Sequence, residues 1–236
     1  MIHSFLMIGQ SNMAGRGKIG EVPPIIDRRI HMLRNGRWVV MTEPINPDRQ
    51  VYPTIERFPI SGVGLAASFA GEYVNFFADD AGLIPCADGG TSLNDWAVGG
   101  LLYDNAVSQS RLAQRTSEFS GILWHQGEGD CTTMENVGAY HDKFIDFIVS
   151  LRKDLNVGNV PLVIGEIGEI CPRGQSQHSH EINEVFHSIS KDLPNCAVAS
   201  AEGLTLYEDG LHFDSVSQRE FGRRYFAEYK SLVNNK

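Results

Sequence analysis

The sequence has little of what disulfide-rich, nucleic-acid-binding or membrane-spanning proteins depend on. Its four cysteines are scattered, without a Cys-x-x-Cys pair, which argues against a dense disulfide framework and predicts a reducing, cytoplasmic compartment. Lysine and arginine number 20 against 29 aspartates and glutamates, and the resulting formal charge of −9 disfavours nucleic acid and anionic membranes as partners. The cysteines are Cys86, Cys131, Cys171 and Cys196.

Long hydrophobic runs are also missing. The N-terminal segment from Met1 to Ile8 has an apolar run that is too short for a bilayer span, and it lacks the basic leader and small-residue cleavage site of a signal peptide. We interpret it as the first strand, while a secreted origin with a trimmed leader stays open. With 42% apolar and 21% charged residues, the 236-residue chain has a globular composition and is expected to form one domain, 1–236.

Short apolar runs alternate with amphipathic stretches along the chain, which predicts strands alternating with helices. Strands are expected at 5–8, 83–87, 121–124, 162–164 and 196–200. Helices are expected at 64–79, 102–116, 140–151, 179–190 and 217–232. Such alternation indicates right-handed crossovers and a parallel sheet covered on both faces, so the predicted class is α/β.

Two segments depart from this alternation. Residues 30–41 carry Asn35-Gly36 between two apolar runs, which predicts a hairpin that decorates the first crossover. Residues 42–63 are rich in proline and polar groups and are expected to form a long loop beside a site.

Ligands in parallel α/β sheets lie beyond the carboxyl ends of the strands, so the loops that follow strands are where chemistry is expected. Ser11 follows the first predicted strand, between glycines at 9, 15 and 17 that permit a tight turn. A serine presented in this way is suited to nucleophilic attack. A helix N-cap or an ordinary turn is the alternative for Ser11.

Asp209-Gly210-Leu211-His212 places a carboxylate three residues before an imidazole. This spacing lets Asp209 bind one ring nitrogen while the other faces a nucleophile, although a surface histidine after an Asp-Gly turn is the alternative. Gln126, at another strand end, is a candidate donor to an oxyanion or a residue that satisfies loop carbonyls. A carboxylate two residues later, Glu128, is a second candidate for the acidic partner of the imidazole.

Four weaker patterns have structural interpretations. Residues 62–67 match a dinucleotide-binding glycine pattern without the required preceding strand, and are interpreted as a helix start. His178 and His180 lack a third metal ligand, and Cys131 is interpreted as a buried thiol. Trp96 is suited either to stacking on a sugar or to the core.

Four short blocks, in order, resemble those of the SGNH-fold carbohydrate O-acetylesterases, in the branch of acetylxylan esterases of carbohydrate esterase family 6 and sialate O-acetylesterases. The blocks are Gly9-Gln10-Ser11-Asn12-Met13, Gly89-Gly90-Thr91 with Trp96 following, Trp124-His125-Gln126-Gly127-Glu128 and Asp209-Gly210-Leu211-His212. Family members often continue the third block with Ser-Asp, whereas this chain has Gly129-Asp130.

The resemblance implies a three-layer α/β/α sandwich of the flavodoxin-like kind and a catalytic triad of Ser11, His212 and Asp209. It also implies an oxyanion hole from the N–H of Ser11, an N–H of Gly89 or, slightly favoured, Gly90, and the Gln126 side chain. Further candidates for a supporting or substrate-binding role are Glu128, Asn12 and Trp96.

The expected reaction is therefore hydrolysis of a carbohydrate O-acetyl ester through an acyl-enzyme on Ser11, with neither metal nor cofactor. Loss of a true oxyanion donor at Gln126 is expected to lower turnover about 100- to 1000-fold. A catalytically silent sugar-binding module and an acetyl transferase between sugar hydroxyls are the alternatives. Acetylxylan and acetylated sialic acid both stay open as substrates.

Overall fold

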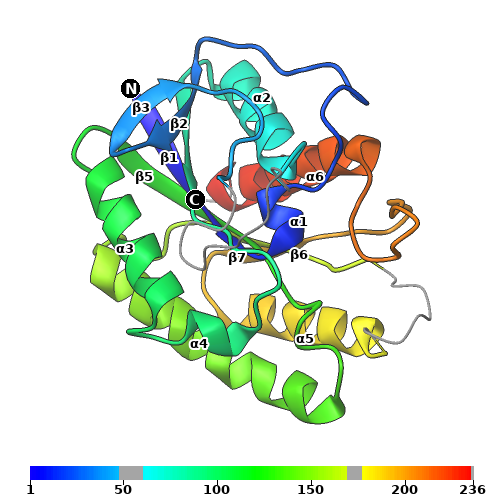
Figure 1. Ribbon diagram of the computed structural model, residues 1–236. Coiled ribbons are helices and arrows are strands. Elements are labelled where there is room, and N and C mark those ends of the chain that lie inside the picture. Colours follow the sequence, from blue (N-terminus) through cyan, green and yellow to red (C-terminus); the bar gives the residue numbers. More distant parts are fainter. Residues whose placement is uncertain (48–60, 169–176, 235–236) are drawn as a thin grey trace.

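The computed structural model describes residues 1–47, 61–168 and 177–234, and its centre is a seven-stranded sheet (Figure 1). The strands lie in the order β3-β2-β4-β1-β5-β6-β7, and every neighbouring pair is parallel except β2 and β3. Their bounds are β1 Ile2–Gly9, β2 Ile30–Arg34, β3 Arg37–Val40, β4 Asp80–Pro85, β5 Glu118–His125, β6 Leu162–Gly165 and β7 Cys196–Ala199.

The central position of β1 and β5 is consistent with their continuous runs of buried residues. β1 is buried continuously from Ser4 to Gly9, and β5 from Gly121 to His125, as expected of strands that are covered on both faces. β1 pairs with β4 on one side and with β5 on the other, so the end of β1 lies at the middle of the sheet edge. Residues that follow β1 therefore come within reach of the loops after β4 and β5.

Helices cover both faces of the sheet. In Figure 1, α3, α4 and α5 lie on one side and α2 and α6 on the other. Each side has its own core: Trp96, Trp124 and Phe144 belong to one, and Phe5, Phe69 to the other. The helices are α1 Ser11–Ala14, α2 Leu65–Phe77, α3 Leu101–Ala113, α4 Met134–Leu155, α5 Ser179–Asp192 and α6 Ser215–Asn234, with a 3-10 turn, η1, at Leu93–Trp96. The predicted α/β class and its three-layer arrangement are confirmed.

The hairpin at 30–41 forms with the expected turn, since Asn35 and Gly36 both have positive φ, 49° and 72°. It is not an appendage of the crossover, as the sequence suggested. β2 pairs in parallel with β4, so the hairpin extends the main sheet and forms its edge. The apolar residues of β2, two of which belong to the α2 and α6 core, account for this position.

Other differences concern element ends. α4 begins at Met134, where Thr133 Oγ1 caps the helix by accepting from the N–H of Asn136, rather than at Tyr140. The short elements α1 and η1 were not predicted as helices. Within the described residues no helix is both long and apolar enough to cross a membrane. Cys171 and most of the predicted loop at 42–63 lie outside the described residues.

Candidate active site

Three strand ends and one distant loop meet at the carboxyl edge of the sheet. The N–H of Gln10 donates to the carbonyl of His125 at the end of β5 (2.9 Å), and the N–H of Asp88, after β4, donates to the carbonyl of Gly9 (3.0 Å). Gly9 has φ +126°, and a Cβ there would lie 2.1 Å from the His125 carbonyl oxygen. Only glycine fits this crossing of backbones, which fixes where the next residues emerge.

Ser11 begins the four-residue helix α1, and only 5% of the residue is exposed. The helix ends at Gly15, whose φ of +91° turns the chain away, and the N–H of Gly15 donates to the carbonyl of Ser11 (2.9 Å). The N–H of Ser11 itself has no acceptor within the described ranges. Ser11 therefore lies at the start of a helical turn, with one glycine on each side, rather than in a non-helical turn.

The side chains of Ser11, His212 and Asp209 form a continuous chain of hydrogen bonds. The distance from Ser11 Oγ to His212 Nε2 is 3.0 Å, and that from His212 Nδ1 to Asp209 Oδ2 is 2.7 Å. Because a carboxylate only accepts, Nδ1 carries the proton, and Nε2 is left to accept from the Ser11 hydroxyl. This is the arrangement in which an imidazole acts as base toward a serine.

Asp209 is held by backbone donors as well as by the imidazole. Its Oδ1 accepts from the N–H groups of Leu211 (2.9 Å) and His212 (3.0 Å). Burial raises the pKa of Asp209, but these N–H groups and the imidazole outweigh it, so the pKa lies below its usual value. Asp209 is therefore ionised at neutral pH. Its side chain is 47% exposed and that of His212 is 22% exposed, so water reaches this end of the triad.

The side chain of Gln126 is fully hydrogen-bonded within the protein. Its two amide hydrogens are taken by the Thr91 carbonyl (3.1 Å) and by Asp130 Oδ2 (2.6 Å), its oxygen accepts from the Tyr140 hydroxyl (2.8 Å), and it is fully buried. An amide carries two N–H donors, so none is left for a substrate. These contacts do not favour the predicted oxyanion role of Gln126, which stays a prediction; the side chain ties the loop after β5 to the one after β4.

The Gly89-Gly90 turn lies beside Ser11. A Cβ on Gly89 would be 3.7 Å from Ser11 Cβ and 2.5 Å from Arg16 Nη2, whereas a Cβ on Gly90 would point into open space. Gly90 has φ +74°, which favours glycine. In the described part of the chain, neither glycine N–H has an acceptor. Both remain candidates for the oxyanion hole.

Glu128 does not contact His212. Its Oε1 accepts from Asn12 Nδ2 (2.6 Å) and lies 3.2 Å from His125 Nε2. Burial raises the pKa of Glu128, but His125 and the amide of Asn12 outweigh it, and the pKa lies below its usual value. Glu128 is thus a buried carboxylate behind the triad, and the alternative that it is the acidic partner of His212 is contradicted.

Trp96 belongs to the core. It is fully buried, its indole N–H donates to Thr91 Oγ1 (3.2 Å), and its ring packs edge-on against Trp124 with centroids 5.5 Å apart. Stacking of this ring on a sugar is therefore excluded. His178 and His180 are each paired with a glutamate of α5, Glu181 and Glu184. Among the described residues no cluster of three or more metal-ligand side chains is found.

The sequence analysis assigned no role to two residues near Ser11, Gln10 in the first block and Arg16 just after it. Gln10 Oε1 accepts from the N–H of Gly129 (3.4 Å), and its amide nitrogen has no acceptor among residues the structure describes. Arg16 Nη1 donates to the carbonyls of Gly15 (3.0 Å) and Ser11 (3.4 Å). Both lie between Gly9 and Gly17, in the glycine-flanked segment around Ser11. That proximity in sequence was the available signal, because a tight turn keeps the residues on either side of the serine close to it.

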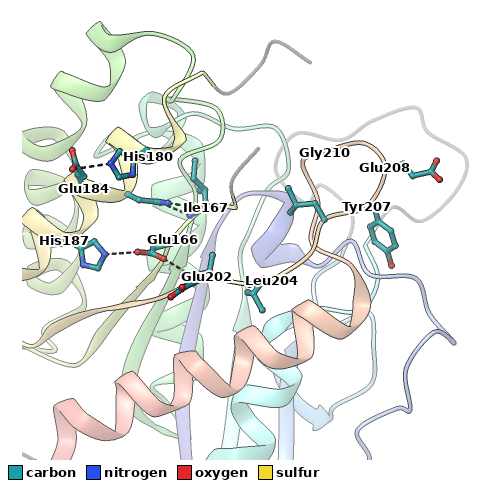
Figure 2. A pocket seen from close by; sticks show the side chains of 14 residues that line it. Glu166, Ile167, His180, Glu184, His187, Glu202, Leu204, Tyr207, Glu208 and Gly210 are labelled. Carbon is teal, nitrogen blue, oxygen red and sulfur yellow. Dashed lines mark hydrogen bonds and ion pairs between the residues drawn. The ribbon is translucent and has the colours of Figure 1, made fainter. Parts of the chain in front are cut away.

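A pocket of about 770 Å³ adjoins the triad loop. Figure 2 shows α5 on one side of it and the loop that carries Tyr207, Glu208 and Gly210 on the other, so the pocket reaches both neighbours of Asp209. We call it the α5 pocket. Its described lining contains four glutamates and neither lysine nor arginine: Glu166, Glu184, Glu202 and Glu208.

Comparison with known proteins shows which family this chain matches. Residues 1–231 match the family described as "Carbohydrate esterase, sialic acid-specific acetylesterase". A probable carbohydrate esterase of Arabidopsis thaliana is 28% identical over 246 residues, which are 96% of this chain and 90% of that protein.

Solved structures show the same architecture. A crystal structure of a protein from Arabidopsis thaliana superposes with a TM-score of 0.85 and 27% identity, covering 99% of this chain and 98% of the other. NanS gives a TM-score of 0.77 at 19% identity, covering 100% and 98%. A carbohydrate acetylesterase from Xanthomonas citri gives 0.74 at 17% identity, covering 99% of this chain and 57% of that one.

Proposed function

The chain belongs to the family of carbohydrate esterases described as sialic acid-specific acetylesterases, which are carboxylic ester hydrolases, and from this we propose that it removes O-acetyl groups from carbohydrates through an acyl-enzyme on Ser11. The observation that carries the proposal is the chain of contacts from Ser11 Oγ through His212 to Asp209, at 3.0 and 2.7 Å. These distances lie within the reach required for proton transfer between a nucleophile and its base.

In the first half of the reaction Ser11 Oγ attacks the acetyl carbonyl carbon while its proton moves to His212 Nε2. The bond from that carbon to the sugar oxygen then breaks, and His212 returns the proton to this oxygen, which releases the sugar. In the second half, water attacks the acetyl-serine, gives a proton to His212 and releases acetate. Ser11 then recovers its proton from the imidazole.

Negative charge develops on the carbonyl oxygen in both halves. We assign its stabilisation to the free N–H of Ser11 and to an N–H of the Gly89-Gly90 turn, which have no competing acceptor within the described parts of the chain. Among the side-chain amides of the described residues, Gln126 has both N–H groups engaged, whereas the amide nitrogen of Gln10, the residue before Ser11, has no acceptor. Gln10 is therefore the candidate for a third donor.

The test is acetate release from p-nitrophenyl acetate and from a panel of acetylated oligosaccharides and acetylated sialic acids. Ser11→Ala is expected to abolish turnover, whereas Ser231→Ala, in the last turn of α6, is a matched control that retains it. A fluorophosphonate is expected to add one adduct mass on Ser11. Sugar binding without turnover in the unmodified protein would instead favour a binding module, and an acetylated acceptor sugar among the products a transferase.

A further inference from the structure

One buried side chain, that of Asn12, binds the backbone on both sides of His212. Asn12 Nδ2 donates to the carbonyl of Leu211 (3.1 Å), and Asn12 Oδ1 accepts from the N–H of Phe213 (3.1 Å). These two groups belong to the peptide bonds on either side of the His212 α carbon. Asn12 is only 1% exposed, and it directly follows Ser11 on α1. A single amide thus joins the backbone beside the nucleophile to the backbone of its base.

The surroundings of Asn12 leave its amide one orientation. Its nitrogen faces two acceptors, the Leu211 carbonyl and Glu128 Oε1, the latter at 2.6 Å. Its oxygen faces the N–H of Phe213 and Gln218 Nε2, which also donates to the Asn12 carbonyl (3.2 Å). An amide turned by 180° would oppose donor to donor and acceptor to acceptor.

Glu128 is held in turn by His125. His125 Nε2 lies 3.2 Å from Glu128 Oε1, and His125 Nδ1 lies 3.2 Å from the Tyr225 hydroxyl. Because the Glu128 carboxylate only accepts, His125 Nε2 carries a proton and donates to it, while the Tyr225 hydroxyl that faces Nδ1 donates to the carbonyl of Trp124 (2.8 Å). The imidazole therefore presents its ring to Glu128 in a fixed place, and the carboxylate cannot turn away from Asn12 without losing both partners.

From these contacts we propose that Asn12, with its amide held in place by Glu128, is a positioning residue that sets the distance between Ser11 Oγ and His212 Nε2. The inference rests on the proposed function, because it assigns to His212 the role of base. Asn12 touches no reacting atom in this arrangement. It acts through the main chain of His212, and Glu128 acts through Asn12.

The other hydrogen bonds around His212 tie the triad loop to itself. Asp209 Oδ1 accepts from the N–H groups of Leu211 and His212, and the N–H groups of Tyr207, Gly210 and Asp214 donate to carbonyls of the same loop. The loop carries a histidine that is 22% exposed and an aspartate that is 47% exposed, and the bonds to Asn12 are the ones that fix the backbone of His212 relative to α1. Phe213 is buried below it. Without Asn12, both peptide groups around His212 lose their partners on α1.

The first experiment measures kcat, KM and Tm of Asn12→Ala with p-nitrophenyl acetate. A displacement of about 1 Å between base and nucleophile costs about 100-fold, so kcat should fall by that order while KM stays within about twofold. Asn195→Ala is the control. The side chain of Asn195 donates to the carbonyl of Asn159 (2.8 Å) just before β7, at the opposite edge of the sheet, so this variant should lower Tm and keep kcat.

The second experiment exchanges donor and acceptor between positions 12 and 128. Asn12→Asp places a carboxylate against Glu128 and should be at least as impaired as Asn12→Ala. Adding Glu128→Gln supplies an N–H that donates to the new carboxylate, so the double variant should recover about tenfold in kcat over Asn12→Asp alone. Recovery stays incomplete because the bond to Leu211 is still missing. If Asn12→Ala yields no folded protein, this pair carries the test.

Two results would overturn the proposal: an Asn12→Ala enzyme whose kcat lies within about threefold of the unmodified protein, or a double variant no faster than Asn12→Asp. Failure of the proposed function is seen elsewhere, in the unmodified protein, as turnover that survives Ser11→Ala. The two failures are therefore distinguishable in one set of measurements.

Discussion

Replacing Asp209 with asparagine tests the assignment of the triad most directly, because it removes one charge and changes little else. In the substituted side chain the oxygen can still accept from the N–H groups of Leu211 and His212, as Asp209 Oδ1 does at 2.9 and 3.0 Å. Its NH2 group, however, would face His212 Nδ1. The imidazole must then carry its proton on Nε2, where it can no longer accept from Ser11.

The size of the effect follows from the exposure of this pair. For charges about 4 Å apart the attraction between carboxylate and imidazolium is about 4 kcal/mol in partly screened surroundings and about 1 kcal/mol in water. Because Asp209 is 47% exposed, we place the electrostatic part between these limits, or about 5- to 1000-fold in rate. The unfavourable tautomer adds to it, and a total near the roughly 10⁴-fold loss known for the equivalent change in a serine protease is the upper bound.

The assay is kcat/KM for p-nitrophenyl acetate between pH 5 and 9, with Glu128→Gln as the comparison and Tm as the control for folding. Glu128→Gln keeps an acceptor for Asn12 and should lose at most about tenfold. The reasoning fails if Asp209→Asn retains more than about a fifth of the activity, or if Glu128→Gln is the more damaging of the two, which would return the acidic role to Glu128.

Four further outcomes follow from individual contacts. Gln126→Ala should lower Tm, because Asp130 and Tyr140 lose a buried partner, but lower kcat less than about tenfold; a 100-fold loss would restore Gln126 to the oxyanion hole. Gly9→Ala, whose Cβ would lie 2.1 Å from a carbonyl oxygen, should destabilise the fold by about 3 kcal/mol or more in urea titration, and a stable variant would refute the tight crossing. Burial raises the pKa of Glu166, but hydrogen bonds from His187 and the Ala201 N–H outweigh it, and the pKa lies below its usual value. The unfolded chain therefore binds more protons, so the stabilisation that the Glu166 carboxylate provides is present above pH ~4.3 and is lost as pH falls through the lowered pKa. Glu166→Gln should flatten the decline of Tm with acid. Finally, the four glutamates of the α5 pocket should disfavour anionic sugars, so Glu208→Lys should raise kcat/KM for acetylated sialic acid relative to acetylated xylo-oligosaccharides, and an unchanged ratio would place the substrate elsewhere.

Much of the fold could be predicted because its signals are local. The buried run of β1 and the amphipathic faces of α2 and α5 are visible in a few consecutive residues, and Asn35-Gly36 specifies its turn by backbone conformation alone. The partner of the hairpin was not visible. That β2 pairs with β4 depends on packing against α2 and α6, whose contribution is spread over residues far apart in the sequence.

The same division holds for the candidate site. Ser11, Asp209 and His212 stood out by residue type and spacing, and the fold brings Ser11 and His212 together across 201 positions. The contacts of Gln126 could not be predicted, because spacing places a side chain at a strand end but does not say which way it turns. That direction is decided by Asp130 and Tyr140, which follow it by 4 and 14 positions and come from a loop and a helix.

Under the proposal made above, the precision of this site depends on buried residues behind the triad. His212 and Asp209 are partly open to water, whereas Asn12, Gln126 and Glu128 are 5% exposed or less. Asn12 donates to Glu128, and Gln126 is bound by Asp130 and Tyr140. Hydrogen bonds in such surroundings are stronger and cost more when one partner is removed. A substitution in the buried layer therefore lowers stability and activity together, and only paired changes such as Asn12→Asp with Glu128→Gln separate a residue that aims the base from one that merely holds the fold.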